Sequence, residues 1–164
     1  MTTVISDFYT IGVYGQSAEE FFSTLVTNQI DTFIDIRRRR AVRGSKFSFV
    51  NSKRLQNKLR ELGINYIHIL ELAPTNEIRE LQKSEDKKLG VLKRERNELG
   101  KIFVSEYKKQ ILEQFDLSEL IKKLSLLNAQ RPVLFCVEKE PEACHRSIVS
   151  SKLAVDYNSN IHHL

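Results

Sequence analysis

The stretch that decides the fold runs Val133-Leu-Phe-Cys-Val-Glu-Lys-Glu-Pro-Glu-Ala-Cys-His-Arg-Ser147. Its first five residues form an apolar run rich in β-branched and aromatic side chains, which predicts a buried strand. Pro141 suits the first turn of a following helix, because its missing N–H has no partner there. The stretch therefore predicts a strand and then a helix, whose first turn or two contain Cys144, His145 and Arg146.

The rest of the chain repeats this alternation of strand and helix. Three further apolar runs predict strands at Tyr9–Tyr14, Asp31–Ile36 and Asn65–Leu70, and residues 160–164 predict a short last one. Helices are expected after Ser17 and Ser52, after a cap at Thr75 or Asn76, from about Ile102, and after Ser118. Alternation of this kind predicts an α/β fold, a three-layer open sheet that is mostly parallel and has helices on both faces. We expect residues 1–164 to form a single α/β domain.

Composition narrows the class of protein. The hydrophobic fraction of 41% and the charged fraction of 29% are typical of a globular protein. No apolar run approaches the length of a membrane span, so we expect no membrane partner. Two cysteines without a secretory signal predict a cytoplasmic protein with free thiols. The sequence does not indicate an oligomeric state.

The positive charge is concentrated in one loop. Residues 37–46 contain five arginines, one lysine and no acidic residue, and these six charges exceed the net charge of +5 of the whole chain. Such a patch indicates an anionic ligand, namely phosphate, a nucleotide or nucleic acid. Phe47, Phe49, Tyr14 and Tyr66 could stack on bases. The alternative is a solvated loop, or one paired with the acidic residues of 76–98.

Right-handed crossovers should bring the strand ends to one edge of the sheet. Ligands of open α/β sheets bind at this edge. Four segments are expected to face a common cleft there: Gly12–Gln16, Asp35–Arg40, Glu71–Thr75 and Glu138–Arg146.

Four sequence motifs resemble the domain-of-unknown-function 488 family. They are Thr10-Ile-Gly-Val-Tyr14, Asp35-Ile-Arg37 with the basic loop to Phe47, Leu62-Gly-Ile-Asn-Tyr66, and Cys136-Val-Glu138 with Pro141-Glu-Ala-Cys-His-Arg146. The resemblance spans nearly the whole chain and implies an α/β fold. It does not indicate which reaction, if any, the protein catalyses. Two places differ from the family pattern: Val13 and Tyr14 replace a His-Ser pair, and Leu72-Ala-Pro74 replaces a glycine-rich turn.

The last motif suggests chemistry. A thiol at a helix N-terminus beside cations can act as a nucleophile, which would make Cys144 reactive. Adjacent helical residues point about 100° apart, however, so Cys144 and His145 are not expected to pair. The alternative is that Cys144 packs in the core and that His145 binds a backbone carbonyl.

Arg146 can bind phosphate or carboxylate bidentately. The alternative is an ion pair with Asp35 or Glu138, and both can hold together. We expect Arg146 rather than Cys144 to be the indispensable member of the motif. Glu138 and Asp35 could form a pair of catalytic carboxylates suited to glycosyl-bond chemistry, or could serve only as arginine partners.

No metal and no cofactor are expected. Six residues are of ligand types that zinc accepts, namely Cys136, Cys144, His145, His68, His162 and His163, but the spacing Cys-x7-Cys-His matches no standard structural site and His162 and His163 fit an exposed terminus as well. Cys136 is also expected to point into the packed face of the sheet.

The sequence thus predicts a protein that binds a phosphorylated ligand, with a leaning towards an enzyme acting on nucleotide-like substrates. The alternative is a non-catalytic nucleic-acid-binding protein that uses residues 37–46. The candidate catalytic residues are Glu138, Cys144, His145 and Asp35. The candidate ligand-binding residues are Arg37, Arg38, Arg40, Arg43, Arg146, Gly12 and Tyr14.

Overall fold

One five-stranded sheet organises the molecule. The computed structural model describes residues 4–164, apart from the side chain of Arg94. The strands are β1 (Asp7–Ile11), β2 (Thr32–Asp35), β3 (Asn65–His68), β4 (Pro132–Phe135) and β5 (Asn160–His163). All of them are parallel, and they lie in the order β3-β2-β4-β1-β5. The parallel sheet and the short last strand are confirmed.

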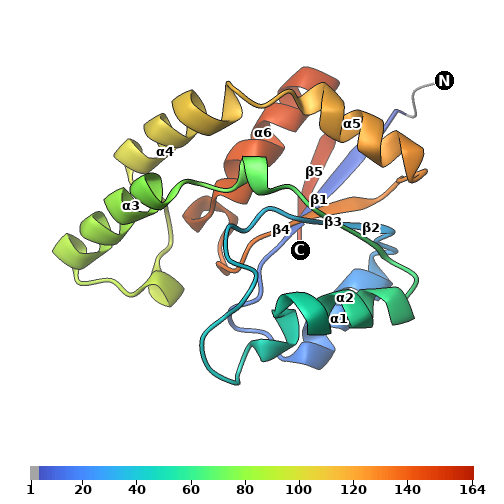
Figure 1. Ribbon diagram of the computed structural model, residues 1–164, viewed down its shortest axis with the longest axis horizontal. Coiled ribbons are helices and arrows are strands. Elements are labelled where there is room, and N and C mark those ends of the chain that lie inside the picture. The colour runs from blue at the N-terminus through green and yellow to red at the C-terminus, as the bar shows by residue number, and fades with distance from the viewer. Residues whose placement is uncertain (1–3) are drawn as a thin grey trace.

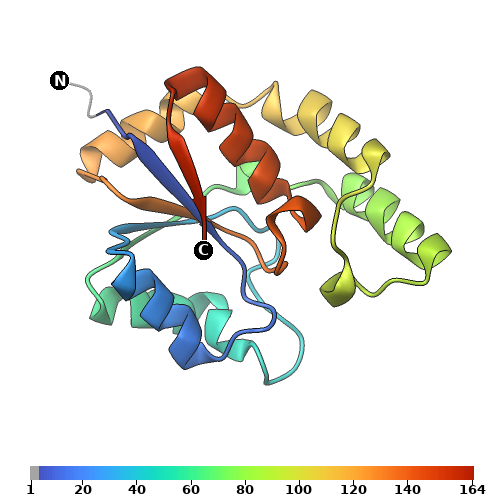
Figure 2. The same cartoon turned by 180° about the vertical axis from the view of Figure 1, so that it is seen from behind.

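Helices cover both faces of this sheet, which confirms the three-layer arrangement. Figures 1 and 2 show α1 and α2 on one face and α3, α4, α5 and α6 on the other. Residues 4–164 contain six α-helices, which are α1 (Ala18–Thr27), α2 (Ser52–Glu61), α3 (Asn76–Leu89), α4 (Lys101–Tyr107), α5 (Leu117–Leu126) and α6 (His145–Tyr157). Short 3-10 turns lie at Ser48–Val50 (η1), Leu70–Leu72 (η2), Lys93–Glu95 (η3) and Pro141–Ala143 (η5), and a π-helical turn, η4, at Lys108–Leu112.

The change of face follows from the strand order. The chain moves from β1 to β2 and β3 in one direction across the sheet, and then returns to β4 and β5 in the other. Right-handed crossovers place the helices of the two directions on opposite faces. The neighbouring strands β1 and β4 are consequently followed by helices on opposite faces, α1 and α6. Their carboxyl ends form the switch point at which open α/β sheets bind ligands.

Strand β4 lies in the middle of the sheet, as its apolar run predicts. Leu134 and Phe135 are fully buried. Leu134 packs with the α3–α6 layer, and Phe135 packs with the α1–α2 layer. The period of two in a strand directs neighbouring side chains to opposite faces, so a strand covered on both sides is apolar throughout.

Helix starts were predicted with mixed success. Ser17 and Glu20 form the expected capping box of α1, and Thr75 caps α3. The N-cap position of α2 is Asn51 rather than Ser52, and Asp116 rather than Ser118 caps α5. Each error is one or two residues, because several neighbouring polar residues are acceptable caps.

The start of α6 differs more, and it matters for the site. Pro141 begins the separate turn η5 instead of the first turn of α6. Cys144 follows in an extended conformation, with φ −141° and ψ 147°, and occupies the N-cap position. Cys144 therefore precedes the helix, and His145 is its first residue.

The longest helix in residues 4–164 is α3, with 14 residues. A helix needs about 20 apolar residues to cross a bilayer, and none in this part of the chain is long and apolar enough to do so.

Candidate functional site

The strand ends of β1, β2 and β4 carry most of the predicted site residues. The structure divides these residues into two buried clusters and an exposed loop. Asp35 and Arg37 form one cluster with Tyr66. Glu138, Cys144 and His145 form the other, together with Cys136.

The first cluster centres on Asp35. Arg37 donates to both carboxylate oxygens, from Nε at 2.9 Å and from Nη2 at 2.8 Å, and the Tyr66 hydroxyl donates at 2.7 Å. The Arg37 guanidinium also lies 4.7 Å from the centre of the Phe135 ring. Burial of Tyr66, together with the charge of Asp35, raises the Tyr66 pKa to about 12. Asp35 is thus an arginine partner that anchors the beginning of the basic loop.

Glu138 has cationic partners of its own. Its Oε1 lies 3.1 Å from Arg96 Nη2 and 3.5 Å from Lys93 Nζ. Burial raises the pKa of this carboxyl, but Lys93 and Arg96 outweigh that effect and lower it to about 2. Glu138 is therefore ionised at neutral pH, a state in which it can accept a proton and cannot donate one.

His145 faces both cysteines. Its Nδ1 lies 3.7 Å from Cys144 Sγ and 3.8 Å from Cys136 Sγ. Its Nε2 lies 2.8 Å from the carbonyl oxygen of Ile36. A carbonyl oxygen only accepts hydrogen bonds, so Nε2 carries a proton, and in the neutral ring Nδ1 presents its lone pair to the two sulfur atoms.

The expectation that Cys144 and His145 cannot pair is wrong. It assumed that both residues lie on the helix, where their side chains would diverge by about 100°. Cys144 is extended and precedes the helix, which lets its thiol reach His145 Nδ1. The carbonyl contact proposed as the alternative for His145 is also present.

Cys136 is a member of the cluster that sequence reasoning left out of the site. Its thiol donates to Glu138 Oε2 at 3.1 Å. Burial raises the Cys136 pKa well above its usual value. The spacing Cys136-x-Glu138 at a strand end was the available signal, because residues i and i+2 of an extended chain lie on one side.

Arg146 has a structural role in the core, where its guanidinium links three other residues by hydrogen bonds. It is fully buried and donates from Nη1 to the Glu138 carbonyl, from Nη2 to the Lys139 carbonyl at 3.0 Å, and from Nε to Thr10 at 3.3 Å. Within residues 4–164 it forms no ion pair with Asp35 or Glu138, so the carboxylate partner considered for it is wrong. Two backbone carbonyls take that place.

The charged segment after α3 covers the Glu138 cluster. Arg96 binds Asp86 at 2.7 Å, Glu138, and the Ala143 carbonyl at 3.0 Å. The Leu99 N–H donates to the Glu142 carbonyl at 2.9 Å. Residues 93–99 thus form a strap over the end of β4. Sequence reasoning missed this role of Arg96, because the charge pattern does not reveal which distant carboxylate a cation meets.

The basic loop is anchored at its beginning and exposed further on. Arg38 donates to the Pro74 carbonyl at 2.6 Å, and Arg40 lies 3.5 Å from the Tyr66 hydroxyl. Arg39 and Arg43 are exposed.

The aromatic residues of this region pack inwards. Tyr14 contacts Phe47 with ring centres 5.1 Å apart, and both are buried, as is Phe49. The three rings therefore contribute to the core, which leaves only Tyr66 partly exposed.

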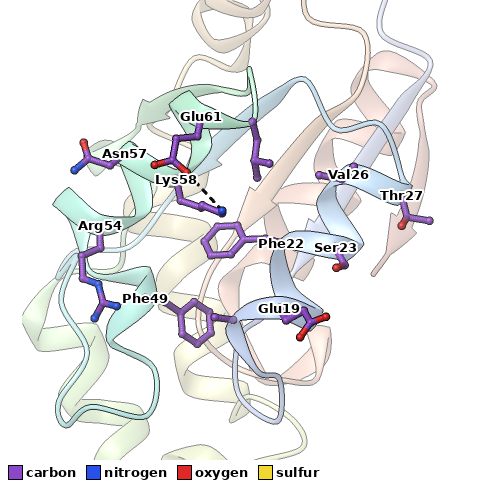
Figure 3. A pocket seen from close by; sticks show the side chains of 12 residues that line it. Glu19, Phe22, Ser23, Val26, Thr27, Phe49, Arg54, Asn57, Lys58 and Glu61 are labelled. Carbon is purple, nitrogen blue, oxygen red and sulfur yellow. Dashed lines mark ion pairs between the residues drawn. The ribbon is translucent and has the colours of Figure 1, made fainter.

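A surface groove of about 760 Å³ lies between α1 and α2. Figure 3 shows Phe22 and Phe49 in its floor, with Arg54 and Lys58 on the α2 side and Glu19 on the α1 side. The two buried clusters do not line this groove. Its walls carry both signs of charge, which gives it no clear preference for an anionic ligand.

Comparison with known proteins identifies one similarity. The family described as "Domain of unknown function DUF488" matches residues 17–153. No curated protein and no solved structure gives a significant match.

Proposed function

Since the chain belongs to the DUF488 family, whose description names no activity, we propose a function from the residues of the chain itself. We propose that the protein binds the phosphate backbone of nucleic acid through a basic surface formed by residues 37–60. This segment comprises the basic loop and nearly all of α2. The observation that carries the proposal is the charge of this one continuous segment.

Residues 37–60 contain ten lysine and arginine residues and no acidic residue. The loop supplies six of these cations, and the region of α2 supplies Lys53, Arg54, Lys58 and Arg60. The ten charges exceed the net charge of +5 of the whole chain, so the rest of the protein is net acidic. A local surplus of this size attracts a polyanion and releases its counterions on binding.

Most of these cations lack an acidic partner. Among the residues that the structure describes, ion pairs involve only Arg37, with Asp35, and Lys58, with Glu61. In residues 76–98, which could have neutralised the loop, Asp86 pairs with Arg96 and Glu80 with Lys83. These interactions favour an external anion as the partner of the loop.

The anchoring of the loop supports the same function. Arg37 is buried and held by Asp35, and Arg38 is bound to the Pro74 carbonyl. The next cations, Arg39, Arg43 and Lys46, are exposed. A loop fixed at its base holds such side chains in place for a ligand at a smaller entropic cost than a free chain would.

The direct test is binding of a fluorescent single-stranded oligonucleotide, measured by anisotropy. The triple variant Arg39→Ala/Arg43→Ala/Lys46→Ala should bind at least about tenfold more weakly at low salt. The matched control Lys87→Ala/Lys88→Ala/Lys109→Ala removes the same charge from exposed positions elsewhere. Equal weakening in both variants would show that only the net charge matters and would contradict a defined binding surface.

A second candidate function is an enzyme acting on nucleotide-like substrates. It is favoured by the pairing of His145 Nδ1 with the Cys144 thiol at 3.7 Å, an arrangement that can activate a thiol nucleophile. The cluster is buried beneath the strap of residues 93–99, so a substrate would reach it only if the strap moved. Turnover of a nucleotide panel that is lost in Cys144→Ser and His145→Gln would support this candidate.

The cytoplasm fits either function as a location, and this too is a proposal. Both cysteines are free although they lie side by side, and a reducing compartment keeps such thiols free.

A further inference from the structure

We propose that Cys136, Cys144 and His145 form a zinc site with two thiolate ligands, one imidazole ligand and one open position. This zinc site is separate from the basic surface of residues 37–60, and the proposal does not depend on whether that surface binds nucleic acid. These donor atoms favour zinc, because zinc binds thiolate and imidazole ligands well, whereas hard cations prefer oxygen ligands.

The distances between the three ligand atoms fit one tetrahedral ion. The two sulfur atoms and Nδ1 all lie within 4.8 Å of one another. The two sulfur–nitrogen distances are 3.7 and 3.8 Å. Usual zinc–sulfur and zinc–nitrogen bond lengths place a tetrahedral sulfur and nitrogen about 3.6 Å apart and two sulfur atoms about 3.8 Å apart. Both sulfur–nitrogen distances already fit, and the two sulfur atoms, which are at most 4.8 Å apart, would need to approach each other by no more than about 1 Å.

The backbone holds the ligands from two elements. Cys136 directly follows β4, and Cys144 and His145 lie at the junction of η5 and α6. Their separation of eight and nine residues therefore reflects the turn between β4 and α6. The standard short spacings arise in other types of turn, which is why spacing alone argued against a metal here.

The orientation of the imidazole is that of a metal ligand. The Ile36 carbonyl accepts the Nε2 proton at 2.8 Å, which leaves Nδ1 free to coordinate. A ligand histidine commonly donates its other N–H to a carbonyl or a carboxylate, which fixes the ring and its tautomer.

The charge balance also fits a buried ion. Cys136, Cys144 and His145 are each no more than 6% exposed, and an uncompensated charge at such depth is costly. One Zn²⁺ with two thiolates is neutral overall. The carboxylates of Glu138 and Asp86 and the cations Arg96 and Lys93 already balance one another, so the ion would leave no net charge in the cluster.

The fourth position would face Glu138. Its Oε2 lies 3.1 Å from Cys136 Sγ, where it can hold a water molecule or complete the coordination. Three protein ligands of the Cys₂His type with one open position are characteristic of zinc sites that bind a water or a substrate.

The test is titration of the reduced, chelator-treated full-length protein with Co²⁺ as a spectroscopic probe, followed by competition with Zn²⁺. We expect one equivalent to bind, with visible bands of a tetrahedral ion and thiolate-to-metal absorption equal to two thiolates. Zn²⁺ should displace it. These signals come from the wild-type protein, so they do not depend on whether a variant folds.

Variants locate the ion. Loss of a ligand should weaken Co²⁺ binding in each of three variants, Cys136→Ser, Cys144→Ser and His145→Gln. The effect should exceed the loss of about 10–100-fold that is usual when a residue that only hydrogen-bonds a metal ligand is removed. The matched control His162→Gln changes an exposed terminal histidine and should leave the titration unchanged.

Three results would overturn the proposal: no uptake of Co²⁺ by the reduced protein, uptake without thiolate absorption, or uptake lost in His162→Gln. A wild-type protein that forms a Cys136–Cys144 disulfide and takes up no metal after reduction would likewise contradict it. Because nucleic-acid binding is measured separately with the loop variants, either proposal can fail while the other stands.

Discussion

The backbone of Gly12 packs against the carbonyl group of Glu138, in the space that a Cβ on residue 12 would occupy. The contact joins the end of β1 to the end of β4. The N–H groups of Val13 and Tyr14 both donate to the Val137 carbonyl at 3.1 Å beside it. Gly12 was predicted as a ligand-binding residue. The structure gives it a packing role, because only a residue without a Cβ lets these two strand ends approach so closely.

We expect Gly12→Ala to destabilise the protein by about 1–3 kcal/mol, the usual cost of overpacking a well-packed interior. The added methyl group would force the Glu138 carbonyl away and disturb Arg146, which binds it. Urea unfolding measures the effect. Gly100→Ala is the control, because its Cβ would meet ordinary contacts; an equal loss in both variants would exclude packing at Gly12 as the cause.

Arg146 should be indispensable for stability. Arg146→Gln removes the donors to two backbone carbonyls, of which the one of Glu138 is buried and would be left unsatisfied at a cost of about 1–3 kcal/mol. A thermal melt measures the loss. Arg43→Gln, at an exposed position, should change stability by no more than about 0.5 kcal/mol. A melting temperature unchanged in Arg146→Gln would show that the hydrogen bonds of Arg146 do not stabilise the fold.

Glu138 should make the folded state sensitive to acid. Its pKa is lowered to about 2 from 4.5, so the ionised carboxylate stabilises the fold above pH 4.5. This contribution is lost as the pH falls from about 4.5 to about 2, because the unfolded chain takes up the proton first. Glu138→Gln should flatten the curve of stability against pH in this window and should be less stable at pH 7 by about 3 kcal/mol. Glu113→Gln, at an exposed position, should keep the wild-type curve.

The strap of residues 93–99 should control access to the two thiols. Arg96→Ala removes its contacts with Asp86, Glu138 and Ala143. We expect Cys136 and Cys144 to react at least about tenfold faster with a thiol reagent, because local opening costs less free energy without these bonds. Lys101→Ala, an exposed neighbour, should react at the wild-type rate. Equal rates in both variants would mean that another segment protects the thiols.

The fold was largely predictable, because it follows from local patterns. The apolar run at the centre of β4 indicates a strand covered on both sides, and alternation of strands with helices indicates a parallel sheet. The convergence of Gly12, Asp35 and Glu138 at one edge follows from right-handed crossovers alone.

The chemistry of the site was less predictable, because it depends on one backbone conformation and on long-range pairs. The extended conformation of Cys144 brings its thiol to His145, and nothing in the residue types near Pro141 separates a 3-10 turn from the start of a helix. The pairing of Arg96 with Glu138 spans 42 residues. Such a pair is fixed by the path of the chain in space and not by the pattern of charges.

The dependence of oligonucleotide affinity on salt tests the central proposal most directly. For a single strand, the logarithm of the binding constant should fall against the logarithm of salt concentration with a slope of about −0.7 for each phosphate neutralised. We expect the slope of Arg39→Ala/Arg43→Ala/Lys46→Ala to be shallower than the wild-type slope by about 2, and that of Lys87→Ala/Lys88→Ala/Lys109→Ala to be unchanged. A wild-type slope retained in the loop variant would contradict binding of nucleic acid by residues 37–60.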